Sequence, residues 1–238
     1  MNKNLFPLLF FIFFTSAAFA QLKPPMEDVR GTLAKTHYSD YEKLVSLFSD
    51  AIEKYPDHQA SWNDRGVCKL MLQDYAGALA DFNKAIELSS YYPEAHYNRA
   101  ILYLKRQEYG KALEDLAVVI QLHPDDVYAY YNSGIAKYFS GVKEGAVNDY
   151  NQAIKLSPTF HEAYANRAFI KNETGQSDAA IQDYSKAIEQ KPDDAEYYFH
   201  RGKVYLKTGN KDKACNDFSK AAELGSAAAT AQKKESCK

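Results

Sequence analysis

Residues 127–160 read VYAYYNSGIAKYFSGVKEGAVNDYNQAIKLSPTF. The first half of this stretch, and the second half from Gly145 to Leu156, both place apolar residues at helical spacing. Gly141 lies between the halves, where the chain needs a turn, and Pro158 ends the second helix. The stretch therefore predicts a helical hairpin. A hairpin of this size cannot bury both of its faces alone, so it needs neighbours.

The same pattern recurs every 34 residues in five consecutive units. Each unit has a small residue in its first helix, and these are Gly66, Ala100, Gly134, Ala168 and Gly202. Each also has a large apolar residue in its second helix, with an alanine four residues before it and an alanine, or in one unit Val119, three residues after it; the large residues are Phe82, Leu116, Tyr150, Tyr184 and Phe218. Regular copies of one hairpin predict an all-α fold in which each unit packs on the next, and such stacks are usually binding surfaces.

The pattern of a small residue, an alanine, an aromatic residue, an alanine and a proline at these offsets resembles the tetratricopeptide repeat. Trp62 falls on that family's tryptophan position, while Pro124, Pro158 and Pro192 fall on its proline position. The resemblance covers residues 59–228. It implies a right-handed α-solenoid of stacked antiparallel helical hairpins, the tetratricopeptide superhelix.

Two departures from the family pattern recur along the chain. Arginine stands where the family prefers leucine, at Arg65, Arg99, Arg167 and Arg201, and lysine replaces an aromatic at Lys69, Lys137 and Lys171. An aspartate follows the arginine position by 16 residues in every unit: Asp81, Asp115, Asp149, Asp183 and Asp217. We expect an Arg–Asp ladder between helices, inside a repeat or across the seam to its neighbour. The alternative is two independent solvated faces. Because Ser133 breaks the arginine series, Asp149 should face water or another partner.

The first twenty residues do not follow the repeat. Lys3, an apolar run and the small-x-small sequence Ala18-Phe19-Ala20 predict a secretory signal peptide; an uncleaved anchor is the alternative. The mature chain is then exported to the periplasm or the outside of a bacterial cell, with no stable membrane insertion.

The predicted divisions are a signal peptide 1–20, a degenerate repeat or cap 21–58 with helices near 26–35 and 39–54, repeats 59–92, 93–126, 127–160, 161–194 and 195–228, and a C-terminal capping segment 229–238.

The chain has three cysteines, and export would permit a disulfide. Cys215 lies in the second helix of the last repeat, and Cys237 lies near the end of the capping segment. A bond between them would pin a terminus that otherwise frays, so we predict a Cys215–Cys237 disulfide. Cys68 falls on the inward side of a first helix and is expected to be a buried thiol.

In the family that the chain resembles, the first helices line a concave groove. Carrying its groove positions over gives a predicted partner-binding set: Tyr97, Asn98, Tyr128, Tyr131, Asn132, Tyr138, Phe139, Asn166, Phe169 and Phe199. Amides can hydrogen-bond an extended backbone, and aromatic anchors flanked by polar groups are typical of interface hot spots. The alternative is that the asparagines bond to neighbouring helices and the aromatics pack between repeats. The cationic clamp for a terminal carboxylate is missing at these positions.

The formal net charge is −2 and no basic block is present, which argues against a nucleic-acid partner. No phosphate-binding loop, nucleophile elbow or zinc motif occurs, so we expect neither an enzyme nor a cofactor or metal. We predict an exported scaffold that binds a protein partner, as a peptide segment or helix, in the concave groove. The alternative is a structural subunit of a cell-envelope assembly that uses its convex or end surfaces. Self-association is left open, and light scattering would separate these two functions.

Overall fold

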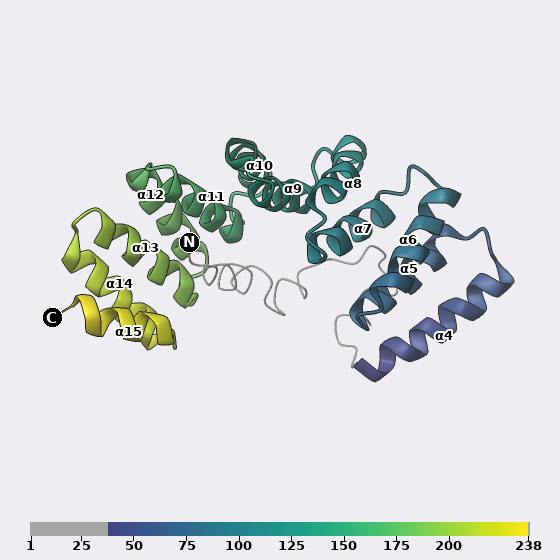
Figure 1. The fold of residues 1–238 in the computed structure, drawn as a ribbon, viewed down its shortest axis with the longest axis horizontal. Coiled ribbons are helices and arrows are strands. Elements are labelled where there is room, and N and C mark those ends of the chain that lie inside the picture. Colours follow the sequence, from purple (N-terminus) through teal and green to yellow (C-terminus); the bar gives the residue numbers. More distant parts are fainter. Residues whose placement is uncertain (1–37, 238) are drawn as a thin grey trace. The chain divides into compact units, whose positions relative to one another are not determined.

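The computed structural model describes residues 38–237, and within that range the chain forms twelve α-helices and no strand. The predicted all-α helical repeat is confirmed (Figure 1). The predicted signal peptide and the helix near 26–35 lie outside the described residues. The helices are α4 (Tyr38–Lys54), α5 (Gln59–Met71), α6 (Tyr75–Leu88), α7 (Pro93–Lys105), α8 (Tyr109–Leu122), α9 (Val127–Phe139), α10 (Lys143–Leu156), α11 (His161–Glu173), α12 (Ser177–Gln190), α13 (Ala195–Lys207), α14 (Lys211–Glu223) and α15 (Ala227–Ser236).

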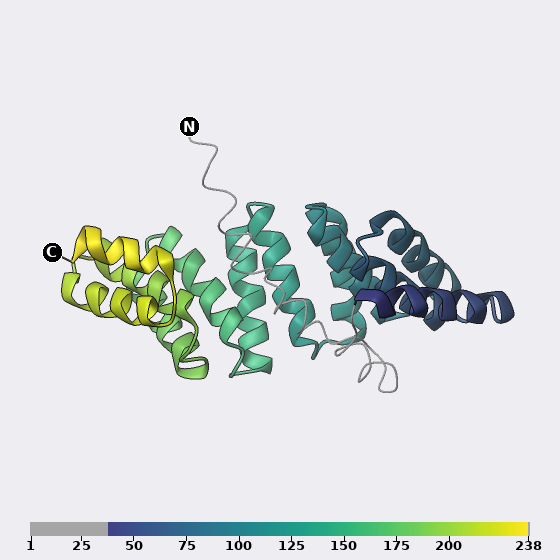
Figure 2. The same cartoon turned by 90° about the horizontal axis from the view of Figure 1, so that it is seen from below.

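The described chain divides into two compact units, the first ending at Leu102 and the second starting at Tyr103, inside α7. In the first unit α4 packs against α5, and α5 forms a hairpin with α6. In the second unit α9 pairs with α10, α11 with α12 and α13 with α14. The last helix, α15, packs on α14, and Figure 2 shows the two lying along each other at the C-terminal end.

The turn inside each hairpin is made by a residue with positive φ. Gly141 has a φ of 83°, and Gly175 and Gly209 have values of 83° and 81° at the equivalent positions. The predicted turn at Gly141 is therefore confirmed. The first two repeats place Gln73 and Gln107 there, with φ values of 63° and 61°. A side chain in the left-handed region costs on the order of 1 kcal/mol, so neighbouring contacts must offset this strain.

Where the first helix of a hairpin has a glycine at the small-residue position, the core contains a close contact between that glycine and a ring. A Cβ atom built on Gly66 would lie 2.7 Å from Phe82 Cε1, and one on Gly202 would lie 2.8 Å from Phe218 Cε1. Both rings are fully buried. Glycine at these positions lets the paired helices approach closely enough for the ring to fill the space between them.

The Arg–Asp ladder is present in the structure, and the alternative of two solvated faces is wrong. Within one repeat, the Arg167 Nε and Nη2 atoms donate to Asp183 at 2.8 and 2.6 Å. Arg65 with Asp81 and Arg201 with Asp217 have the same two-bond geometry, at 2.7–2.9 Å. A planar guanidinium matches a carboxylate in this fork arrangement, which lysine cannot reproduce.

Each of these guanidinium groups also reaches the preceding repeat. Nη1 of Arg167 donates to Asn151 Oδ1 at 2.6 Å, and Nη1 of Arg201 donates to Ser185 Oγ at 2.9 Å. Arg65 and Arg99 make the equivalent bonds to Ser49 and Asn83. One arginine therefore ties three helices together, two in its own repeat and one across the seam.

The recurring lysines complete the ladder. Lys69, Lys137 and Lys171 each place Nζ 2.7–2.8 Å from the aspartate of their own repeat. Asp149, which faces Ser133 instead of an arginine, is buried and pairs with Lys137 at 2.7 Å. Asp149 was expected to face water or another partner, and in the structure it pairs with another partner, Lys137. The arginines and lysines that depart from the family pattern therefore pair with the same series of aspartates.

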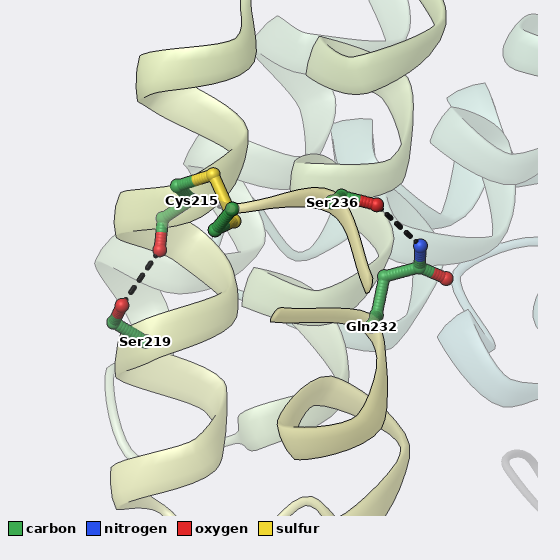
Figure 3. The surroundings of a disulfide bond; sticks show 5 residues. Cys215, Ser219, Gln232 and Ser236 are labelled. Atoms are coloured by element: carbon green, nitrogen blue, oxygen red, sulfur yellow. Dashed lines mark hydrogen bonds between the residues drawn. A yellow bond between two sulfur atoms is a disulfide. The ribbon is translucent and has the colours of Figure 1, made fainter. Parts of the chain in front are cut away.

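The C-terminal helix is held to the repeat before it by a covalent bond. Cys215 on α14 and Cys237 after α15 are joined, with 5.7 Å between their Cα atoms (Figure 3). The Ser226 side chain accepts a bond from the Ala229 amide and caps the start of α15. Cys68 is buried and free, and burial raises the pKa of its thiol to about 12. The prediction of a buried thiol at Cys68 is confirmed.

Replacing Cys237 by serine is expected to lower the free energy of unfolding by about 3 kcal/mol, because the bond closes a loop across 22 positions. Urea unfolding followed by circular dichroism measures this loss. Adding reductant to the parent chain should reproduce it, whereas a Cys68→Ala variant should still respond to reductant. A parent chain that shows three reactive thiols after denaturation without reductant would contradict the bond.

Candidate functional site

The predicted binding residues of the second unit lie on three first helices, α9, α11 and α13. Contacts between ring side chains connect these helices. Tyr138 on α9 meets Phe169 on α11 edge to face, with ring centroids 5.9 Å apart. Phe169 in turn meets His200 on α13 at 6.4 Å. The first helices therefore form one side-chain surface in this unit, which we call the first-helix face.

Aromatic side chains on the first-helix face remain partly exposed. They are Tyr128, Tyr131, Tyr138, Phe139, Phe169 and Phe199. Phe139 stacks on Tyr109 at 5.3 Å and contacts Tyr138 at 5.2 Å. Burial raises the pKa of Tyr138, whose hydroxyl donates to Glu173 Oε2 at 3.1 Å. The strip is thus held in place by ring contacts while its outer edges reach solvent.

Two asparagines of the predicted binding set are buried. Asn132 and Asn166 are only 7% and 5% exposed. Asn166 donates to the hydroxyls of Tyr131 and Tyr150, at 3.2 and 3.4 Å. For Asn166 these distances match the alternative in which the amides join neighbouring helices. The burial of Asn132 and Asn166 leaves little of either side chain for a peptide backbone.

Tyr97 and Asn98 belong to the first unit. Asn98 donates to Asn63 Oδ1 at 2.9 Å, a bond that runs from α7 to α5. Asn63 is completely buried. Like Asn166, Asn98 therefore bridges successive repeats. Tyr97 is partly exposed.

Charged residues outside the predicted binding set flank the aromatic strip. Glu162 and Glu196 occupy the register of Tyr128 one and two repeats later. Burial, assisted by Asp194, raises the pKa of Glu196. Lys143 pairs with Glu173 at 3.1 Å. The 34-residue offset from Tyr128 was the signal that could have found the two glutamates.

His200 sits among rings on the same face. It stacks on Tyr184 with centroids 6.0 Å apart, and its side chain is 16% exposed. Burial, together with the positive charge of Lys203, lowers the pKa of His200 from 6.5 to about 4. The imidazole is therefore neutral at neutral pH and behaves as an aromatic packing residue.

Lowering the pH from 6.5 to about 4 is expected to destabilise the fold through His200. In this window His200 of the unfolded chain binds a proton that His200 of the folded chain does not. The stability contributed by the neutral imidazole is therefore complete above pH 6.5 and is lost as the pH falls. The loss should reach about 1–3 kcal/mol. Thermal melting at neutral and acid pH measures it. A His200→Phe variant should lose less stability on acidification, and an equal loss would contradict the assignment to His200.

Among residues 38–237, no group of three or more histidine, cysteine or carboxylate side chains has the arrangement of a metal site. In the same range no helix has the length and apolar character needed to cross a bilayer. The polar groups of the first-helix face can donate, accept and pair charge. The aromatic strip can supply apolar contact to a ligand lying across the helices.

Family comparisons give a consistent result along the chain. Models described as TPR repeat match residues 71–106 and 170–209, and models described as tetratricopeptide repeat match 93–126, 127–160, 149–182 and 195–226. Together the matches run without a gap from residue 71 to residue 226. The chain contains tetratricopeptide repeats. Proteins of this kind are generally scaffolds without enzymatic activity.

Solved structures of tetratricopeptide-repeat proteins share the fold. YrrB, described as a TPR protein with an unusual peptide-binding site, has a TM-score of 0.67 at 20% identity, over 80% of this chain and 99% of that one. MamA has a TM-score of 0.65 at 26% identity, over 70% and 91%. A tetratricopeptide repeat protein from Parabacteroides merdae has a TM-score of 0.59 at 22% identity, over 94% and 90%. Comparison with curated protein sequences gave no match.

Proposed function

We propose that the protein is an exported tetratricopeptide-repeat scaffold that binds a segment of a protein partner on the first-helix face of its second unit. The observation that carries this proposal is the strip of partly exposed rings on α9, α11 and α13, centred on Tyr138 and Phe169. Such rings combine large apolar area with little conformational freedom to lose, and rings of this kind dominate binding energy at interfaces.

Three further observations support the proposal. The tetratricopeptide fold is that of protein–protein interaction scaffolds, and YrrB, which shares this fold, is described as having a peptide-binding site. The sequence of residues 1–20 has the composition of a secretory leader. The Cys215–Cys237 pair suits an oxidising compartment outside the cytoplasm.

The binding face is tested by capturing partners in the native envelope with the mature chain, residues 21–238, followed by crosslinking and mass spectrometry. A Phe169→Gln, Phe199→Gln variant should lose capture at least about tenfold while its helical signal and melting temperature stay close to those of the parent. The matched control is Leu156→Gln, an exposed apolar residue on α10 of the same unit. Unchanged capture by the double variant, or its unfolding, would show that the rings serve only the core.

Export is tested separately by cell fractionation and N-terminal sequencing. The proposal expects a mature chain that begins near Gln21 outside the cytoplasm. A cytoplasmic chain that retains residues 1–20 would overturn the proposed location without affecting the binding face.

A further inference from the structure

The side of α14 that faces α15 differs from the same side of the earlier second helices. Two positions of the earlier second helices are always large and aliphatic, and they hold Leu79, Leu113, Val147 and Ile181, and Ile86, Ile120, Ile154 and Ile188. Ile188 of α12 lies in an apolar cluster with Tyr197 of α13, and Ile181 packs against that cluster. On α14 the same two positions hold Cys215 and Ala222. The last second helix therefore offers little apolar area to the helix that covers it.

The covering helix, α15, contributes little apolar packing of its own. Asp194 caps the start of α13, and Ser226 caps the start of α15. Three positions after the cap, α13 has the buried side chain of Tyr197, whereas α15 has Ala229. Ala229 is the only buried residue between the two ends of α15. A methyl group thus stands where a phenol ring stands one repeat earlier, so apolar contact holds α15 weakly.

Hydrogen bonds from the α15 side chains do not fasten this helix to α14 either. Within residues 38–237 they stay inside α15 and its cap. Thr230 donates to the Ser226 carbonyl oxygen at 3.1 Å, and Gln232 donates to Ser236 at 2.8 Å (Figure 3). The covalent bond from Cys215 to Cys237 is therefore the main link between α15 and the rest of the unit.

The hairpin beneath α15 has a core that does not depend on it. The fully buried Phe218 ring of α14 fills the space above Gly202 of α13 and lies 6.0 Å from the Phe199 ring. Arg201 on α13 donates two bonds to Asp217 on α14. These contacts remain in place if α15 leaves, so losing this helix should not unfold the hairpin.

The disulfide can be reached from solvent, because Cys215 and Cys237 are both partly exposed. A thiolate of a dithiol attacks one of the two sulfurs and forms a mixed disulfide, and the second thiol of the reagent then closes its own disulfide. The protein gains two electrons and two protons as two cysteine thiols, and the dithiol loses them. A free helix of ten residues is marginal in water, so α15 without the bond should fray.

We propose that the Cys215–Cys237 bond makes α15 a redox-controlled cap. In oxidising surroundings the cap is docked on α14, and reduction of the bond releases it while the hairpins before it stay folded. Cys215 and Ala222, which release uncovers, are small, so the opened end does not expose a large apolar patch and the bond can form again. If the chain is exported as proposed above, the cap closes after the chain has left the reducing cytoplasm.

Hydrogen–deuterium exchange of the full chain, measured by mass spectrometry before and after dithiothreitol treatment, tests this cap. Amides of α15 should exchange at least about tenfold faster after reduction, and those of α11 and α12 should change less than about twofold. Alkylation of the denatured chain counts the free thiols in each sample. Cys215→Ser and Cys237→Ser should exchange like the reduced parent and ignore dithiothreitol. The matched control, Cys68→Ala, should respond as the parent does.

Three results would overturn the redox-controlled cap. Unchanged protection of α15 in a chain whose three thiols are all free would mean that packing, not the bond, holds this helix. Faster exchange spread evenly from α11 to α15 would mean that the bond supports the whole unit. A chain re-oxidised with glutathione disulfide that stays unprotected at α15 would show that release is not reversible. None of these results bears on the proposed binding face, which has its own variants.

Discussion

Replacing Asp183 by alanine is expected to lower the free energy of unfolding by about 3–5 kcal/mol, the usual cost of removing one partner from a buried ion pair. Asp183 is buried and accepts two bonds from Arg167, while Nζ of Lys171 lies 2.8 Å away. The substitution leaves two positive groups facing each other with no anion between them. Urea or thermal unfolding of the variant and the parent chain measures the loss.

Two comparisons make this prediction specific. Asp149→Ala should cost less, since within residues 38–237 Asp149 pairs with a single cation, Lys137. Glu189→Ala breaks an exposed pair with Lys186 and should cost less than about 0.5 kcal/mol. A loss at Asp183 no greater than at Glu189 would mean that the ladder contributes specificity but little stability.

The ladder could be predicted because its members recur at fixed offsets. Arg167 and Asp183 are 16 residues apart, and this spacing recurs in other units, so their pairing follows from hairpin geometry. The role of Lys171 could not be predicted in the same way. It was noticed as a departure from the family, but a long flexible side chain does not reveal its direction through spacing alone.

The proposed binding face was harder to predict than the fold. Periodicity places Asn166 and Phe169 on the same helix face, yet Asn166 is buried against Tyr131 while Phe169 stays partly exposed. The difference depends on which neighbouring side chain can accept a bond, and a single sequence does not contain that information. Glu162 was missed because an isolated carboxylate on a helix usually faces solvent.

Replacing Phe82 by alanine is expected to destabilise the first unit by about 3–5 kcal/mol, because the change removes a large buried ring and leaves a cavity. Phe82 is completely buried, and it fills the space left by the missing side chain of Gly66. The matched control is Tyr91→Ala, since Tyr91 is 79% exposed and should cost less than about 0.5 kcal/mol. Urea unfolding of both variants measures the difference.

The close approach at Gly66 provides a further test of the same packing. A Cβ atom there would lie 2.7 Å from the Phe82 ring, so Gly66→Val alone should destabilise the hairpin. In the Phe82→Ala background the valine has room, and it should recover part of the lost stability by filling the cavity. Additive losses in the double variant would show that the two positions are not in contact, and would remove the packing basis for a small residue at this point in every repeat.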